Sequence, residues 1–194
     1  MLGLCQEIQS KGLEVSWSCQ ARVNTVDPEL LKTMYDSGCK EIYFGIEAAT
    51  EKLLTYLGKN ISIDQATQAM TWAREVGMKP GCFFMVGVPT ETKEDIEAIA
   101  AFVCQVKPSY IGLSVLIPFP GTELYTRTHS LIKPELLERF DQWDDTRSSI
   151  YKDNTFEVNP KESVKYIEKV FRDIIGEGGI DYNPSQFVIH RYDE

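Results

Sequence analysis

Histidine, basic charge and long apolar runs are all scarce in this sequence. Its 194 residues include two histidines, and the formal net charge is -9 at pH 7. This acidic balance argues against an electrostatic footprint for nucleic acid. No stretch approaches the roughly 18 apolar residues of a membrane helix, and the opening LGLCQEIQSKG lacks the basic and apolar segments of a signal peptide. We therefore expect a cytoplasmic protein with no membrane segment and no evident nucleic-acid partner.

The cysteines do not form a metal-binding pattern. An odd number of cysteines without a signal peptide argues for free thiols in a reducing compartment. No two of them stand close enough in the sequence for a CxxC motif, so we expect no metal site made by this chain alone. The five cysteines are Cys5, Cys19, Cys39, Cys82 and Cys104.

The sequence does contain a repeated strand–helix pattern. Strands are predicted over residues 14–23, 40–47, 79–89 and 109–121, from the alternation of apolar and polar residues. Helices are predicted over residues 26–38, 62–77 and 92–106, with Asp27, Ser62 and Thr92 as N-caps, and a short helical turn over 50–58. Strand and helix alternate at intervals of roughly thirty residues, which is typical of parallel βα units.

The two faces of the predicted strands differ in character. One face is bulky and apolar, as expected beneath a layer of helices, whereas the other is small or polar. A doubly wound sheet would be apolar on both faces, so the pattern favours the concave side of a barrel or half-barrel that receives a ligand. The small or polar positions are Ser16, Ser18, Gln20, Arg22, Gly45, Glu47, Gly81, Gly87, Gly112 and Ser114.

Glu47 ends an apolar strand on the face predicted to be concave. In such folds the site lies at the C-terminal ends of the strands, where Arg22, Gly87 and Pro118 also fall. Two interpretations of Glu47 remain open. It contacts a ligand, or it forms a structural ion pair with a neighbour such as Arg22, which would need good geometry to offset the loss of hydration.

Residues 127–194 are predicted to form a helical C-terminal extension to a domain that spans residues 1–126. Helices are expected around residues 133–143 and 159–176. Asn159 caps the second helix, whose expected buried stripe includes Val164, Ile167, Phe171 and Ile174. The last stretch, 181–194, is expected to be a loosely docked terminus.

Four stretches, each at the end of a predicted strand, carry a family resemblance: WSCQARV, GIEAAT, GVPTET and IPFPGTELY. In this order and spacing they resemble the later part of a radical S-adenosylmethionine enzyme, in the subgroup that often carries a cobalamin-binding domain before the barrel. The resemblance covers residues 1–126. It implies an α/β fold, a partial TIM-like (β/α)6 barrel made of parallel strands 3 to 6 of the family barrel, with the helical tail after it.

The resemblance also implies cofactors. Family members bind S-adenosylmethionine and a [4Fe–4S] cluster, which a CxxxCxxC motif after the first strand holds on three thiolates; cobalamin is a candidate in this subgroup. This chain has no such motif. We therefore expect the cluster loop and the first two strands to lie upstream of Met1, and a shortened chain that is inactive alone. Methylation, tetrapyrrole ring chemistry and methylthiolation all occur on similar barrels, so the small-molecule substrate stays unknown.

Matched residue by residue, the resemblance implies contacts with the cofactor. Glu47 matches the acidic residue near the ribose and methionine of S-adenosylmethionine. Arg22 would bind the cofactor carboxylate through its planar guanidinium. Gly87 ends a strand that passes close to the adenine, where a side chain would block the approach.

The last strand would add further contacts. Leu116 and Pro118 would present backbone groups to the edge of the adenine. Gln20 and Ser114 face the predicted lumen and would touch the substrate. No catalytic side chain and no metal ligand is assigned within this chain.

Two other functions stay open. Another βα-barrel enzyme, such as a phosphate-handling isomerase or aldolase, would need a glycine-rich phosphate loop and a lumen Lys or His, and no strand end provides them. A non-catalytic binding module fits the absent cluster motif. If two strands are missing, residues 15–23 form an exposed edge, which would self-associate or be covered by the tail helix near residues 164–174.

Overall fold

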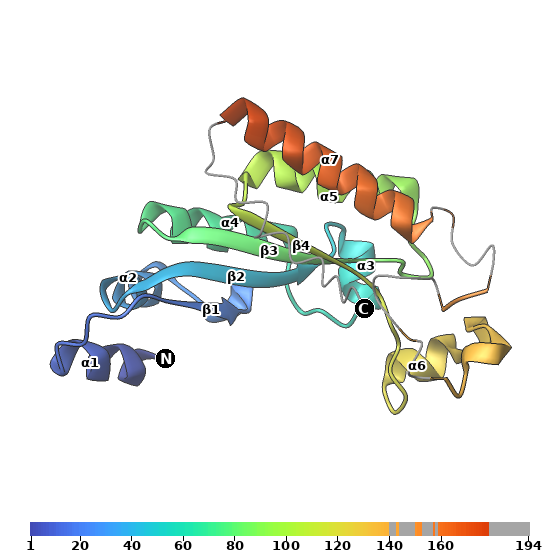
Figure 1. Cartoon of the computed structure of the whole chain (residues 1–194), viewed down its shortest axis with the longest axis horizontal. Coiled ribbons are helices and arrows are strands. Elements are labelled where there is room, and N and C mark those ends of the chain that lie inside the picture. The colour runs from blue at the N-terminus through green and yellow to red at the C-terminus, as the bar shows by residue number, and fades with distance from the viewer. Residues whose placement is uncertain (140–142, 144–149, 153–156, 158, 179–194) are drawn as a thin grey trace.

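The computed structural model describes residues 1–139, 143, 150–152, 157 and 159–178. These residues form a four-stranded parallel sheet in which neighbours in sequence are neighbours in space (Figure 1). The order never reverses, as it does in a doubly wound sheet, so the sheet is a segment of a barrel wall. The predicted α/β class is confirmed. The strands are β1 (Trp17–Ala21), β2 (Cys39–Glu47), β3 (Lys79–Val86) and β4 (Tyr110–Val115).

Helices cover one face of this sheet (Figure 1). The strand residues beneath them are fully buried, as the alternation predicted; Ile42, Phe44 and Phe84 are 0% exposed. The helices that pack on the sheet are α2 (Pro28–Asp36), α4 (Ile63–Glu75), α5 (Lys93–Val106) and α7 (Pro160–Gly178). The remaining elements are α1 (Leu2–Ser10), η1 (Val23–Thr25), α3 (Glu51–Tyr56), α6 (Glu123–Thr128), η2 (His129–Leu131) and η3 (Pro134–Leu136).

The predicted helix caps are present and fix where the crossover helices begin. The Asp27 side chain accepts from the Leu30 N–H at 2.8 Å. Ser62 forms the expected capping box with the third helical residue, Gln65. Thr92 is the N-cap of α5, and its N–H donates to Asp95 at 2.9 Å. Each cap satisfies helix-end donors that would otherwise have no partner.

Strand β1 is shorter than predicted. It begins at Trp17, and Val15 lies before it with 43% of its surface exposed. At the other end Arg22 has already left the strand and is the N-cap of η1. Within the described residues β1 pairs only with β2, so it is an edge strand as predicted. Self-association through this edge stays a prediction.

The C-terminal helix is placed differently from the predictions. Helix α7 packs on α5 and contacts β3 and β4, so it belongs to the same outer layer as the other crossover helices (Figure 1). The idea that it folds over the open β1 edge is therefore wrong. Its residues Ile167 and Phe171 are buried as predicted. The predicted division between residues 126 and 127 falls inside α6.

One helix predicted in the tail is not formed as expected, and other predictions for the tail fall outside the described residues. Where a helix was expected from residue 133, the described residues form the single 3-10 turn η3, which begins at Pro134. The side chain of Ile174, the stretch 181–194, and most of residues 140–149 lie outside the described residues. Ile132 and Tyr151 form an isolated antiparallel bridge here and share a small separate core with Ile150.

Three aromatic rings occupy the concave face at the N-terminal half of the strands. Tyr43, Phe83 and Tyr110 lie with ring centroids 5.3 to 6.0 Å apart. Glycines opposite make room for them: a Cβ on Gly81 would lie 2.6 Å from the Tyr43 ring, and one on Gly112 would lie 2.3 Å from Phe83. These two glycines were expected to open the face to a ligand. Instead they admit neighbouring side chains that form a packed floor.

Candidate functional site

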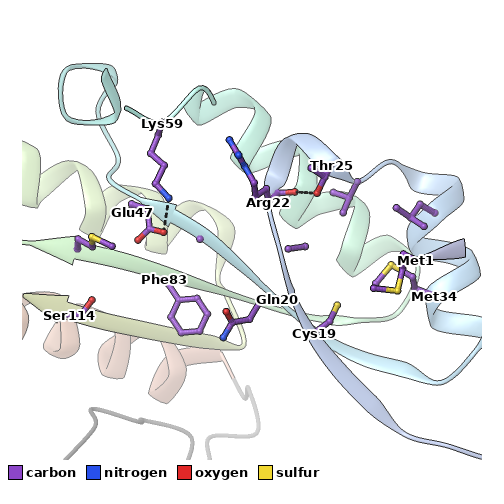
Figure 2. Close-up of a pocket in the computed structure, with 15 residues that line it drawn as sticks. Met1, Cys19, Gln20, Arg22, Thr25, Met34, Glu47, Lys59, Phe83 and Ser114 are labelled. Atoms are coloured by element: carbon purple, nitrogen blue, oxygen red, sulfur yellow. Dashed lines mark hydrogen bonds and ion pairs between the residues drawn. The ribbon is translucent and has the colours of Figure 1, made fainter. Parts of the chain in front are cut away.

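A cavity of about 680 Å³ lies beside the edge strand (Figure 2). It wraps around β1, because its lining includes side chains from both faces of that strand. On the concave face lie Gln20, Gly45, Glu47, Phe83, Met85 and Ser114. On the helix side lie Cys19, Ala21, Val26, Leu30 and Met34; Met1, Arg22, Thr25 and Lys59 complete the lining.

Glu47 has an unusual backbone conformation. Its φ is +76°, in the left-handed region that favours glycine, and the pairing of β2 with β3 shifts register between Gly45 and Glu47. The side chain folds back along its own strand, so that a Cβ on Gly45 would lie 2.8 Å from the Glu47 Oε1 atom. Strain of this kind is typical of functional sites, where neighbouring groups hold it in place.

Lys59 is the group that holds Glu47. Its Nζ lies 3.0 Å from Glu47 Oε1, and Figure 2 shows the two side chains directed at each other. The Glu47 side chain is 12% exposed and the Lys59 side chain 33% exposed, so the pair is only partly open to water. Partial burial strengthens the attraction between the two charges but also costs them hydration, so the pair fixes the direction of the carboxylate more than it stabilises the fold.

The ion-pair partner proposed for Glu47 from the sequence was wrong. Arg22 is exposed and lies apart, with its carbonyl accepting from the Thr25 hydroxyl at 2.8 Å (Figure 2). Lys59 was missed because it lies in the loop after α3, twelve positions beyond Glu47. The one signal for it is its place directly after Gly58, whose φ of +67° turns the chain back.

Four of the seven predicted contact residues line one cavity: Gln20, Arg22, Glu47 and Ser114. The other three do not. Leu116 is buried and its N–H donates to the Val86 carbonyl at 2.8 Å, so that donor is already used. Pro118 is also buried. Sequence reasoning in turn assigned no role at the site to Phe83 and Met85, which the alternation of β3 places on the concave face.

Gly87 is a glycine for a packing reason. Its φ is +79°, and a Cβ there would lie 3.1 Å from Pro160 of α7 and 3.2 Å from Val115. Its N–H donates to the Glu91 carboxylate at 2.8 Å. The space in front of Gly87 is thus filled by the protein itself.

Two buried carboxyl groups organise the loop between β3 and α5. Glu91 is 3% exposed; burial raises its pKa to about 7, although the Gly87 N–H acts to lower it. Its Oε1 atom is buried and has no hydrogen-bond partner. Burial also acts to raise the pKa of Asp95, but hydrogen bonds from Lys52, Thr50 and Thr92 outweigh it and hold that pKa below its usual value.

The described residues do not fit an iron–sulfur cluster. They contain no group of three His, Cys, Asp or Glu side chains placed to hold a metal ion. The same part of the chain contains no helix with the length and apolar character needed to cross a bilayer. The polar groups at the cavity do fit an organic ligand, because one carboxylate, two cations and an amide meet apolar side chains there.

A model of the radical SAM superfamily matches residues 2–103. An uncharacterized methyltransferase of Pyrococcus horikoshii is 36% identical over 118 residues, which cover 61% of this chain and 26% of that protein. An anaerobic magnesium-protoporphyrin IX monomethyl ester cyclase of Cereibacter sphaeroides is 31% identical over 125 residues, 62% of this chain and 20% of the cyclase. The chain thus spans about a quarter or less of the length of these relatives.

Solved structures share the fold. Methylornithine synthase superposes with a TM-score of 0.58 at 16% identity, over 88% of this chain and 42% of the synthase. The methyltransferase TsrM from Kitasatospora setae, solved with cobalamin and a [4Fe–4S] cluster bound, superposes with a TM-score of 0.56 at 17% identity, over 84% of this chain and 34% of TsrM.

Proposed function

The chain belongs to the radical SAM superfamily, and on that premise we propose that it forms the part of a radical S-adenosylmethionine enzyme that binds the adenosine end of the cofactor at Glu47. One observation carries this proposal. A carboxylate stands at the C-terminal end of a barrel strand, on the concave face, in a strained conformation held by Lys59. Ligands of barrels of this kind bind at that end of the strands.

Each polar group at the cavity has a distinct role in this proposal. Lys59 occupies the Oε1 atom of Glu47, and no described hydrogen bond reaches Oε2. Oε2 is thus the acceptor for the ribose hydroxyls. The exposed guanidinium of Arg22 receives the carboxylate of the methionyl group. Phe83 and Met85 offer the apolar surface on which an adenine would pack.

The cofactor supplies the difficult chemistry when bound, which is reductive and radical in character. The residues of this chain bind and orient it. They do not fit the cluster, so we propose that the cluster ligands belong to a longer protein that includes this chain, and that this chain is inactive alone. Cobalamin is a candidate for the same longer protein, by analogy with TsrM.

The predicted adenine contacts need revision within the same proposal. Gly87, Leu116 and Pro118 lie outside the cavity lining, and two of them face packing or backbone partners. They would act by shaping the loops after β3 and β4. Gln20 and Ser114 stay candidates for substrate contact, since both line the cavity. The substrate is proposed to be a small molecule. The five free thiols suit a cytoplasmic location.

The test is ligand binding to isotopically labelled chain. S-adenosylhomocysteine, which carries the same adenosine, is titrated while backbone amide shifts are followed by NMR. We expect weak binding, with the largest shifts at Gly45, Glu47 and Lys59. Glu47→Gln should weaken binding about tenfold or more, because a hydrogen bond to a charged acceptor is worth roughly 1.5–3 kcal/mol.

The matched control is Glu75→Gln, which changes an exposed carboxylate on α4. It should leave the affinity unchanged. Shifts scattered away from the cavity, or equal affinity for Glu47→Gln and the wild type, would remove the proposal.

A further inference from the structure

Helix α3 lies in the chain between the two charges of the candidate site. Glu47 stands three residues before Thr50, the N-cap of α3, and Lys59 stands three residues after Tyr56, the last residue of that helix. The Lys59 side chain nevertheless returns to within 3.0 Å of Glu47. The positions of the two ends of α3 therefore decide whether the cation reaches the carboxylate.

The first end of α3 is held by the loop between β3 and α5. The Thr50 hydroxyl donates to Asp95 Oδ1 at 2.7 Å, and Lys52 forms an ion pair with the same carboxylate. The Lys52 ammonium also donates to the Thr90 carbonyl at 3.1 Å. Because Asp95 is buried, this end of the helix is fixed to the body of the fold.

The last turn of α3 is held by a different part of the chain, helix α6. Arg127 Nη2 donates to the Tyr56 carbonyl at 2.9 Å, and the guanidinium carbon lies 4.6 Å from the centroid of the Tyr56 ring. Carbonyls in the last turn of a helix lack a donor within the helix, so Arg127 supplies one from outside. Figure 1 shows α3 and α6 at the same end of the sheet.

The contact at Tyr56 is connected to Lys59 by a short, turned segment. The chain reverses at Gly58, whose φ is +67°, and the Lys59 N–H donates to the Leu54 carbonyl of α3 at 2.8 Å. A shift of the last turn of α3 would therefore carry the backbone of Lys59 with it. The contacts form one series, from Arg127 to Tyr56, to Lys59 and to Glu47 (Figure 2 shows the last of them).

We propose that Arg127 is a positioning residue for the cofactor site, because it holds the last turn of α3 and thereby keeps Lys59 against Glu47. Its effect on cofactor binding rests on the function proposed above. Arg127 does not line the cavity, so it acts through Lys59 and not by touching a ligand. The proposal gives α6, which follows the last strand of the sheet, a part in the site.

The first measurement needs no ligand. In the full chain labelled with 13C at the glutamate carboxyl groups, the Glu47 resonance is identified with Glu47→Gln, and Lys59→Met gives its position without the cation. Arg127→Met should move this resonance toward the Lys59→Met position. The Arg127 side chain is 41% exposed, so the variant should still fold.

Arg172→Met is the matched control. Arg172 lies on α7, which packs on α5, and is 3.9 Å from Glu168 one turn earlier. Arg127 is likewise 3.9 Å from Glu123 one turn earlier. The two arginines thus share the local ion pair and differ in the contact with α3. Arg172→Met should leave the Glu47 resonance where it is.

The second measurement is the affinity for S-adenosylhomocysteine, followed by NMR. Arg127→Met should weaken binding about threefold or more, because it removes a hydrogen bond and a cation–π contact from the end of α3. In a Lys59→Met background the same substitution should cost less than about 1.5-fold, since residues that act through one another do not give additive effects. Arg127→Lys keeps a charge over the Tyr56 ring and should restore part of the affinity.

The proposal fails if the Glu47 resonance is the same in Arg127→Met and in Arg172→Met. It fails equally if the losses of affinity in Arg127→Met and Lys59→Met add in the double variant. Failure of the proposed function gives a different result: Glu47→Gln binds as the wild type does, while Arg127→Met still moves the Glu47 resonance. That result would remove the cofactor role of the pair and leave the hold of Arg127 on it.

Discussion

Strand β2 ends on a glutamate that follows a glycine, and the loop after β3 carries another, yet the two glutamates have opposite surroundings. Glu47 lines the cavity and is paired with Lys59. Glu91 is buried, accepts one backbone N–H, and keeps its second oxygen without a partner. A carboxylate at the end of a barrel strand is therefore not by itself a binding group. Glu47 can bind a ligand because it faces the cavity and has a cation beside it. Glu91 is buried behind a turn, so it can only support the structure of the loop.

The largest expected effect concerns Glu91. Its pKa is raised to about 7 in the folded chain, against roughly 4.3 for an unfolded glutamate. The folded state then binds more protons than the unfolded state between these values. The Glu91 carboxyl therefore contributes its full stabilisation of the fold below about pH 4.3, and this stabilisation is lost as the pH rises through about 7. The free energy of unfolding should fall by about 2–3 kcal/mol over this window.

Glu91→Gln tests that effect, because glutamine keeps an acceptor for the Gly87 N–H and cannot ionise. The variant should lose the slope between about pH 4.3 and 7 and be more stable than the wild type at pH 8, by denaturant unfolding. Glu47→Gln is the matched control and should keep the slope. An unchanged slope in Glu91→Gln would mean that Glu91 is charged in the fold and that the two glutamates are alike.

A smaller effect should distinguish the two glycines. Gly87→Ala places a Cβ at a left-handed φ of +79° and close to Pro160 and Val115. It should lower the free energy of unfolding by about 2 kcal/mol. Gly45→Ala meets only the end of the Glu47 side chain, which can move, so it should cost less than about 1 kcal/mol.

The two glycine variants should rank in the opposite order when their affinity for S-adenosylhomocysteine is measured. Gly45→Ala displaces the Glu47 carboxylate and should weaken binding several-fold, whereas Gly87→Ala, measured where it is fully folded, should bind nearly as the wild type does. Equal losses of affinity in the two variants would break the distinction between site and scaffold.

The smallest expected effect on stability is at Lys59. Lys59→Met keeps most of the side-chain volume and removes the charge that holds Glu47. Because Lys59 is one-third exposed, the free energy of unfolding should change by less than about 1 kcal/mol. Binding should weaken, and Lys59→Arg should restore part of it. The calorimetric or NMR affinity of both variants, with Lys79→Met as a control for an exposed lysine at the far end of β3, checks this.

Much of the fold could be predicted from the sequence because its signals are local. The alternation that buries Ile42 and Phe44, and the caps at Asp27 and Ser62, depend on a few neighbouring residues. The position of α7 could not be predicted in this way. Its packing against Gly87 joins residues far apart in the chain, and no local pattern encodes which surface an amphipathic helix will cover.

The site was predictable in part for the same reason. Strand ends and alternation brought Gln20, Glu47 and Ser114 to one cavity. Lys59 was missed because a loop residue has no periodicity to fix its direction. Gly81 and Gly112 were wrongly predicted to leave room for a ligand. A glycine has the same pattern in the sequence whether a ligand or a neighbouring ring fills the space above it.

The contact between Gly87 and Pro160 also has a consequence for the order of folding. The sheet and its first crossover helices can assemble from contacts between βα units that are neighbours in the chain, but α7 can dock on β3 and β4 only after the long connection from β4 has been closed. Docking of α7 therefore belongs to the native side of the folding barrier. Substitutions at Ile167 or Phe171 should accelerate unfolding and leave the folding rate almost unchanged, so the lifetime of the folded chain is set largely by its last helix.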